Sequence, residues 1–410
     1  MKKLLIGLLI LVVCLQGGAA LAERVGAPGL QAGDAPEGTQ GGASQTEPQA
    51  GETETPGWQE AHPLAWYRER AEQGDVDALL LLGNKYLSGE GVARNEWQAA
   101  AYFFRAAEKG SAEAQYRLGL MYFFGNGVAE SDSKAREYLQ AAADQAYVPA
   151  YVWLGYIHEY GYSVKRSMEE ALAWYQKGAD AGDAEAQCAL GDLYFNGKGV
   201  AEDLSLAFSW YWKAAEQGNA TGQLTVGWMY YTGSGVAQDD RAAMDWFLKC
   251  AAQGDSFSQY YLGLIYYYGE GVPADMAQAA QWFEKAALQG DVDAQLSLAV
   301  MYDLGRGVDE DKEAAARWYL AAAEQGNADA QYNLGLMYFN GEGMEQNLGL
   351  GLQWFDKAAQ QGDSDAQYNL GYMYEFGEGT AQDYAKAAYW YELAARQGDI
   401  DAQVNLGYLY

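Results

Sequence analysis

Apolar residues recur along most of the chain in a pattern that repeats every 36 residues without insertion or deletion, from Asp75 to Gly398. In each copy they form two runs with the spacing of an amphipathic helix, and a glycine-rich turn separates the runs. Nine copies are complete, and a tenth begins at Asp399 and stops at Tyr410. A fixed period of about 20–50 residues predicts an all-α solenoid, in which two-helix units stack because none can bury its apolar face alone.

The copy from Asn327 to Gly362 contains the signals that define both helices. Asn327 and Asn347 are expected N-caps, whose side-chain oxygens accept hydrogen bonds from amides of the first turn. Gly335 stands inside the first helix, where glycine costs about 1 kcal/mol relative to alanine. Because a glycine recurs there in nearly every copy, we expect the helices to approach closely at this point. The second helix alternates large rings such as Trp354 with alanine, which allows neighbouring helices to interlock.

The ends of the chain differ from the repeats. A basic start, a short apolar run and an Ala-x-Ala site predict a signal peptide cleaved near Ala22, and therefore a periplasmic or secreted protein. Lipoprotein processing at Cys14 is not expected, because Val13 is too bulky for the position before a lipidated cysteine. The Gly-, Pro- and Gln-rich stretch that follows predicts a disordered linker. The expected segments are a signal peptide at 1–22, the linker at 23–57, an N-terminal capping helix at 58–74, nine repeats at 75–398 and a partial tenth repeat at 399–410.

Charge limits the classes of partner. The chain has 26 Lys and Arg against 56 Asp and Glu, a net charge of -30. Such a surface repels nucleic acid, which we exclude as a partner, and it favours basic proteins, cationic ligands or loosely held cations. The alternative is that the acidity only keeps a long apolar stack soluble. The expected partner is a protein or peptide, best suited if it is basic with apolar anchors, and no membrane span is expected after cleavage of the signal.

Motifs for catalysis or cofactor binding are missing from the sequence. The Gly-x-Gly turn resembles a phosphate loop only superficially, since no strand precedes it and no Lys-Ser or Lys-Thr follows. Nothing in the sequence places the two histidines, His62 and His158, together as a metal or catalytic pair. Cys188 and Cys250 occupy helix positions that suit small buried thiols. We therefore assign no catalytic, cofactor-binding or metal-binding residue.

The repeat pattern resembles a known family. The order Ala-x-Ala-Gln-x-x-Leu-Gly-x-x-Tyr, then Gly-x-Gly-Val, then Ala-x-x-Trp-Tyr/Phe-x-x-Ala-Ala-x-Gln-Gly is similar to the Sel-one-like repeat, a branch of the tetratricopeptide-like superfamily. The resemblance covers about residues 60–410 and implies a right-handed α/α superhelical solenoid of 36-residue two-helix repeats. It also implies a concave side, lined largely by first helices, that holds proteins or peptides. Cysteine-rich members of the family carry a disulfide in each repeat, and this chain lacks that cysteine pair in every copy.

Two first-helix positions vary among the copies and are rich in aromatic residues, so we expect them to line a partner-binding groove. The first lies two residues after the recurring leucine, and the second lies three residues further on. The alternative is that these rings pack between successive first helices. The candidate groove residues are Phe123, Tyr156, Phe195, Trp228, Tyr231, Tyr267, Phe339, Tyr372 and Tyr408.

Two regions depart from the regular pattern. In the third copy Ala146 replaces the helix-ending glycine, Pro149 enters the first turn and Ser163 replaces a turn glycine, which indicates a local change of curvature, a ligand contact or drift. At the other end, Tyr408 and Tyr410 belong to a first helix without its second helix. The partial repeat therefore indicates self-association or docking through the C-terminal helix, unless the short helix frays.

The leading functional hypothesis is an exported, non-enzymatic scaffold that binds a protein or peptide on its concave face, with an adaptor or regulatory role in the bacterial envelope. By analogy with some relatives, one alternative is a hydrolase related to cell-wall or beta-lactam chemistry. Another is a purely structural envelope spacer. An enzyme would need a convergent cluster of titratable groups in one pocket, and no motif in this sequence supplies one.

Overall fold

The computed structural model describes residues 63–410, which contain 20 α-helices and no strand. The expected signal peptide, linker and first residues of the capping helix lie outside the described residues. The chain divides into two units at Trp210 and Tyr211, and α10 (Leu204–Glu216) contains the boundary. The first unit contains α2 (Leu64–Glu72), α3 (Val76–Ser88), α4 (Glu96–Glu108), α5 (Ala112–Phe124), α6 (Asp132–Asp144), α7 (Pro149–Tyr160), α8 (Met168–Asp180) and α9 (Ala184–Phe195). The second unit contains α11 (Ala220–Thr232), α12 (Asp240–Ala251), α13 (Ser256–Tyr268), α14 (Met276–Leu288), α15 (Val292–Leu304), α16 (Lys312–Glu324), α17 (Ala328–Asn340), α18 (Leu348–Gln360), α19 (Ser364–Phe376), α20 (Tyr384–Arg396) and α21 (Ile400–Leu409).

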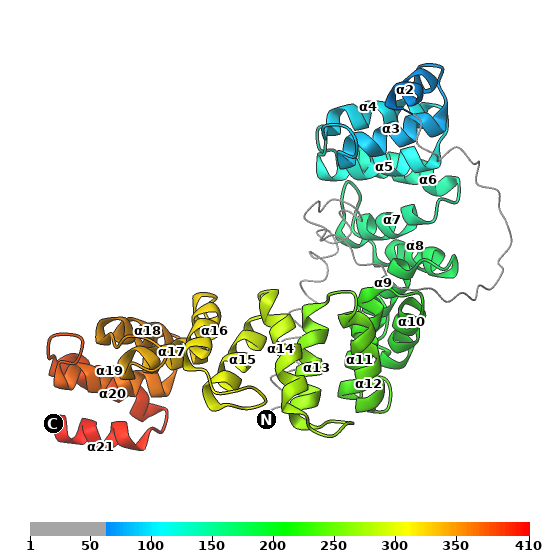
Figure 1. Ribbon diagram of the computed structural model, residues 1–410. Coiled ribbons are helices and arrows are strands. Elements are labelled where there is room, and N and C mark those ends of the chain that lie inside the picture. The colour runs from blue at the N-terminus through cyan, green and yellow to red at the C-terminus, as the bar shows by residue number, and fades with distance from the viewer. Residues whose placement is uncertain (1–62) are drawn as a thin grey trace, which may run out of the picture. The chain divides into compact units, whose positions relative to one another are not determined.

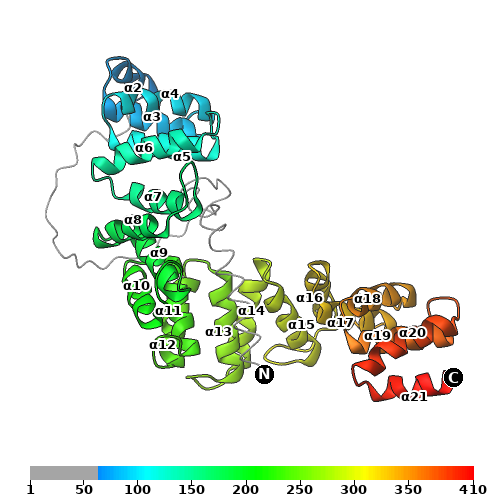
Figure 2. The ribbon, with the colours of Figure 1, turned by 180° about the vertical axis from the view of Figure 1, so that it is seen from behind.

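Two kinds of helix alternate, as the 36-residue pattern predicts. The odd-numbered helices from α3 to α21 are the first helices of the repeats, and the even-numbered helices from α2 to α20 are the second helices. Within each unit, every helix packs against the helices before and after it in the chain (Figures 1 and 2). The fold is therefore an all-α solenoid of repeated units, as expected.

Polar side chains and glycines fix the helix ends. In the repeat that begins at Asn327, the side chain of this N-cap accepts a hydrogen bond of 2.9 Å from the amide of Ala330. The second helix begins in the same way, since Asn347 accepts from the amide of Leu350 at 3.0 Å. The first helix ends at Gly341, whose φ of 74° lies in the left-handed region that favours glycine. The predicted caps of this repeat are confirmed.

Close packing inside each repeat depends on the mid-helix glycine of the first helix. At Gly371, an added Cβ would lie 2.5 Å from Cδ1 of Tyr391, a fully buried ring on the second helix. The same overlap occurs at Gly83, where the nearest atom of Phe103 would be 2.5 Å away. The prediction of close helix approach is therefore confirmed, and the missing side chain is what makes room for the ring.

A ladder of glutamines links one repeat to the next. The Gln367 side chain donates to the carbonyl of Ala359 on the preceding second helix at 3.1 Å. It also accepts from Gln397, at the end of its own second helix, at 2.9 Å. Gln397 reaches one repeat back as well and donates to the carbonyl of Gly362 at 3.0 Å. We call this arrangement the glutamine ladder; its side-chain pairs are Gln115–Gln145, Gln223–Gln253, Gln259–Gln289, Gln295–Gln325, Gln331–Gln361 and Gln367–Gln397.

The irregular third repeat keeps the left-handed turn backbone of the regular ones, although the N-cap residue of α7, Val148, makes no side-chain capping hydrogen bond. Ala146 has a φ of 59° and Ser163 a φ of 53°, so both occupy the left-handed region that glycine fills in other repeats. The Ser163 hydroxyl donates to the carbonyl of Asp132 at 3.2 Å. Pro149 is the first residue of α7, where its missing amide hydrogen breaks no helical hydrogen bond. The unusual residues are thus accommodated without loss of either helix, and Ser163 adds a hydrogen bond to the preceding repeat.

The contact between glycine and ring can be tested with two substitutions at the same repeat position. Gly371→Ala should lower the free energy of unfolding by about 2 kcal/mol, because its Cβ would overlap Tyr391. Gly407→Ala should not be destabilising, since no atom lies within 4 Å of its added Cβ and alanine favours a helix. Urea unfolding followed by circular dichroism measures both, and equal losses of stability would contradict the argument.

Candidate functional site

The type of residue at the second candidate groove position correlates with the ring of the second helix that packs against the mid-helix glycine of the same repeat. Where that ring is tyrosine, the first helix supplies a carboxylate. Tyr175 donates to Glu159 at 2.8 Å, and Tyr391 donates to Glu375 at 2.8 Å. A third pair, Tyr319 and Asp303, has an oxygen separation of 3.4 Å. A carboxylate at the second candidate position therefore supplies the hydrogen-bond acceptor that the buried tyrosine hydroxyl needs.

Repeats with phenylalanine at the glycine site have an apolar or aromatic residue in place of the carboxylate. The ring centroids of Tyr231 and Phe247 are 6.4 Å apart, and those of Phe339 and Phe355 are 6.5 Å apart. Tyr211 is an exception: it is a tyrosine at the ring position, but the second candidate position of its repeat is Phe195 and not a carboxylate. The side chains at this candidate position thus contribute to packing within their own repeats, whatever they present to a partner.

Two candidate residues of the first unit, Phe123 and Tyr156, belong to a packed aromatic cluster. The centroids of Phe123 and Tyr156 are 6.0 Å apart, and Tyr156 is only 5% exposed. Tyr160 lies 4.5 Å from Tyr156 and is 40% exposed. Burial, followed by the negative charge of Glu159, raises the pKa of Tyr160 to about 12. Glu159 is itself buried and forms an ion pair with Lys198.

The remaining candidates are spread over separate repeats and are not gathered at one point. Trp228 is buried, Phe195 is half-buried, and Tyr231 donates to Glu270 at 2.7 Å. Tyr267 accepts from Arg306 at 2.9 Å. Tyr372 is half-buried with its ring 4.7 Å from Phe376, whereas Tyr408 is 81% exposed. Their role in binding a partner stays a prediction.

Sequence reasoning missed a more exposed position, the last residue of the first helices. Tyr268, Leu304 and Phe376 are between 50% and 57% exposed. The signal was present in the sequence, because this position follows the first candidate position by four residues and so lies on the same side of the helix. Four aspartates near the starts of the first helices lie on the same side. In α15, α17 and α19 the aspartate stands eleven residues before the exposed position, and eleven residues make about three full turns of an α-helix. We define the first-helix face of the second unit by Asp293, Asp329, Asp365, Asp401, Tyr268, Leu304, Tyr372 and Phe376.

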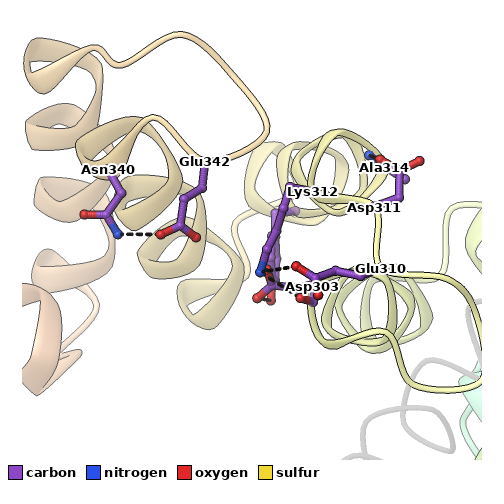
Figure 3. A network of polar contacts seen from close by, with 8 residues as sticks. Asp303, Glu310, Asp311, Lys312, Ala314, Asn340 and Glu342 are labelled. Carbon is purple, nitrogen blue, oxygen red and sulfur yellow. Dashed lines mark hydrogen bonds and ion pairs between the residues drawn. The ribbon is translucent and has the colours of Figure 1, made fainter.

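A polar network marks the boundary between α15 and α16. Lys312 of α16 lies 2.8 Å from the carboxylate of Asp303, which belongs to α15 (Figure 3). The hydrogen bond to Asp303 raises the pKa of Lys312. Glu310 lies 3.6 Å from the same ammonium group. The Asp303 carboxylate is therefore bound by Lys312 and Tyr319 of its own repeat.

A cavity of about 600 Å³ opens between α10 and α12, within the second unit. Its rings are Trp212, Tyr230 and Trp246, and the Lys249 ammonium lies 3.6 Å from the centroid of Trp246. None of its lining residues is histidine, cysteine or serine, and its charged side chains are Glu216, Asp245 and Lys249. Among residues 63–410, no three His, Cys, Asp or Glu side chains gather as metal ligands, and no helix there is long and apolar enough to cross a membrane.

Comparison with known proteins identifies the repeat. The Sel1 repeat model matches residues 76–111, 112–147, 148–183, 184–219, 220–255, 256–291, 292–327, 328–363, 364–399 and 400–410. The structure of c5321, a protective antigen of uropathogenic Escherichia coli with an SLR fold, is 38% identical, with a TM-score of 0.69 over 85% of this chain and 74% of that one. A Sel1 repeat protein from Oxalobacter formigenes is 31% identical, with a TM-score of 0.58 over 79% of this chain and 98% of that one. A search of curated proteins finds no match.

The match between tyrosine and carboxylate can be tested by exchanging one pair for another. Tyr391→Phe should lower the free energy of unfolding by about 1–3 kcal/mol, because it leaves the Glu375 carboxylate against a ring. Adding Glu375→Phe recreates the pair of Phe339 and Phe355 and should recover most of the loss. Urea unfolding of both single variants and the double variant measures the coupling, with the exposed Tyr389→Phe as control. Additive losses would show that the two side chains act independently.

Proposed function

Because the chain belongs to the Sel1 repeat family, we propose that it is an exported scaffold that binds a protein through the first-helix face of its second unit. Sel1-repeat proteins are generally protein–protein interaction scaffolds, and their fold is typically non-enzymatic. The observation that carries the choice of face is the set of exposed apolar residues at the ends of α13, α15 and α19, namely Tyr268, Leu304 and Phe376; the same position is Asn340 in α17. Exposed apolar side chains in register form a surface that a protein partner can cover.

The cellular place of this function rests on the sequence. The expected signal peptide supports a periplasmic or secreted scaffold with an adaptor or regulatory role in the envelope. Neither the hydrolase alternative nor the spacer alternative has an observation of its own in favour.

The binding face can be tested with matched pairs of exposed tyrosine and phenylalanine residues. The full chain is immobilised, and binding proteins are captured from envelope and secreted fractions by crosslinking and then titrated individually. Tyr268→Ala with Phe376→Ala should weaken binding of a captured protein about ten-fold or more, because buried aromatic anchors dominate interfaces. Tyr384→Ala with Tyr389→Ala removes equally exposed rings from the second helix α20 and should leave the affinity unchanged. Unchanged binding by the first pair would remove this face from the proposal.

We further propose that α21 contributes a surface for self-association. In α21 the exposed side chains Ile400, Val404 and Tyr408 follow each other at four-residue intervals and are 72%, 49% and 81% exposed. A second copy of the chain offers helices of the same kind, which could cover this apolar stripe.

Self-association through α21 should respond to a single charge. The chain should sediment as a concentration-dependent dimer, and Val404→Glu should shift it to monomer because a carboxylate would be buried in an apolar contact. Glu284→Lys, on the exposed surface of α14, is a control that should leave the dimer intact. A monomer at every concentration would contradict the proposal.

A further inference from the structure

Positive charge is absent from the first helices of the second unit. The helices α11, α13, α15, α17, α19 and α21 contain no lysine, arginine or histidine. This absence is unexpected from helix physics, because cations are favourable in the last turn of a helix. The second helices follow that preference, with Lys249, Lys285, Lys357 and Arg396 in their last turns. The first helices thus lack cations at positions where local stability favours them.

Three lysines in the last turns of second helices lie over tryptophan rings of their own helix. The ammonium group of Lys285 lies 3.7 Å from the centroid of Trp282, and that of Lys357 lies 3.5 Å from Trp354. Each such cation–π contact occurs between residues three positions apart on the same helix. These three positive charges therefore remain on second helices. Two other second-helix lysines do reach first helices: Lys312 contacts Asp303 of α15, and Lys386 lies over the ring of Tyr374 of α19.

The acidic residues on the same first helices fall into two groups. Asp303 and Glu375 accept hydrogen bonds from buried tyrosines, and Asp303 also contacts Lys312 (Figure 3). The other group is one aspartate in the first turn of each of the last four first helices, and all four are exposed: Asp293, Asp329, Asp365 and Asp401. In the described part of the chain none of these four forms an ion pair. We call them the aspartate row.

Asp329 acts on its neighbour Asp293 in the aspartate row. Partial desolvation, followed by the negative charge of Asp329, raises the pKa of Asp293. The favourable helix dipole accounts for an acidic residue in each first turn, so the row has a structural reason. The dipole does not account for the missing cations at the opposite helix ends or for the exposed apolar residues there. Charge and apolar exposure together describe one surface with an anionic edge and an apolar edge.

We propose that this surface binds a cationic polypeptide segment of the partner, with lysine or arginine side chains against the aspartate row and apolar side chains against Tyr268, Leu304 and Phe376. The eleven residues between the two edges of one helix span about 16 Å. In an extended segment successive side chains point to opposite sides, so a single strand can direct basic residues to one edge and apolar residues to the other. This inference rests on the proposed function and adds the chemistry of the partner to it.

The test uses a fluorescein-labelled peptide of about ten residues in which lysine and leucine alternate. Its binding to the full chain is measured by fluorescence anisotropy at about 0.15 M salt, where long-range attraction between exposed charges is largely screened. A peptide of alternating glutamate and leucine is the control for the apolar side chains alone. A peptide of alternating lysine and glycine is the control for charge alone. Only the lysine–leucine peptide should bind with saturation.

Two variants with the same net charge locate the contact. Asn replacement of the whole aspartate row removes four negative charges from the first-helix face. The control replaces four exposed second-helix carboxylates that form no ion pair in the described part of the chain, as Asp245→Asn, Glu284→Gln, Glu313→Gln and Glu324→Gln. The row variant should weaken binding of the lysine–leucine peptide about ten-fold or more and reduce its salt dependence, while the control should bind within about two-fold of the parent.

Equal weakening by both variants would overturn the proposal, because net charge alone would then explain binding. Binding of the glutamate–leucine peptide with similar affinity, or no binding of the lysine–leucine peptide, would overturn it as well. If a captured protein partner still depends on Tyr268 and Phe376 while the aspartate row has no effect, the proposed function stands and only the cationic segment is rejected.

Discussion

The structure depends on a steric constraint, the overlap between a helix glycine and an aromatic ring. At Gly371 the ring of Tyr391 occupies the space of a Cβ, and the same relation recurs in most repeats. This contact sets the distance between the two helices of a repeat, and that distance decides which side chains of the two helices can touch. Where the ring is tyrosine, its hydroxyl reaches the end of the first helix and requires an acceptor there, which Glu375 provides. A packing requirement therefore decides residues that would otherwise be available for binding.

The two kinds of helix carry different chemistry. Second helices fill the repeat with rings, and three of them hold a last-turn lysine over tryptophan, as Lys357 and Trp354 do. First helices of the second unit present carboxylates and apolar side chains without any cation. The first-helix face of the second unit is therefore anionic and partly apolar. The net charge of -30, by contrast, is a property of the whole chain.

Much of the fold could be predicted from the sequence, because a period of 36 residues with caps and glycines at fixed places leaves few alternatives. The candidate surface was harder to predict. Trp228 looks like a groove residue by its position, yet it is buried, because helical periodicity alone does not say which neighbour covers a side chain. The exposure of Phe376 and the capture of Asp303 by Lys312 depend on contacts between helices. A pairing rule such as Tyr391 with Glu375 is visible in the sequence only once the structure shows which positions touch.

The glutamine ladder has a consequence for how such a protein changes over evolutionary time. Each rung is made by the same atoms, so Gln361 meets Gln331 as Gln397 meets Gln367. Loss or duplication of a whole 36-residue segment brings together ends that already match, and the rungs on either side close again without any compensating substitution. Recombination between copies can therefore add or remove whole 36-residue repeats. An insertion or deletion of a few residues, by contrast, moves the glutamines out of alignment with their partners.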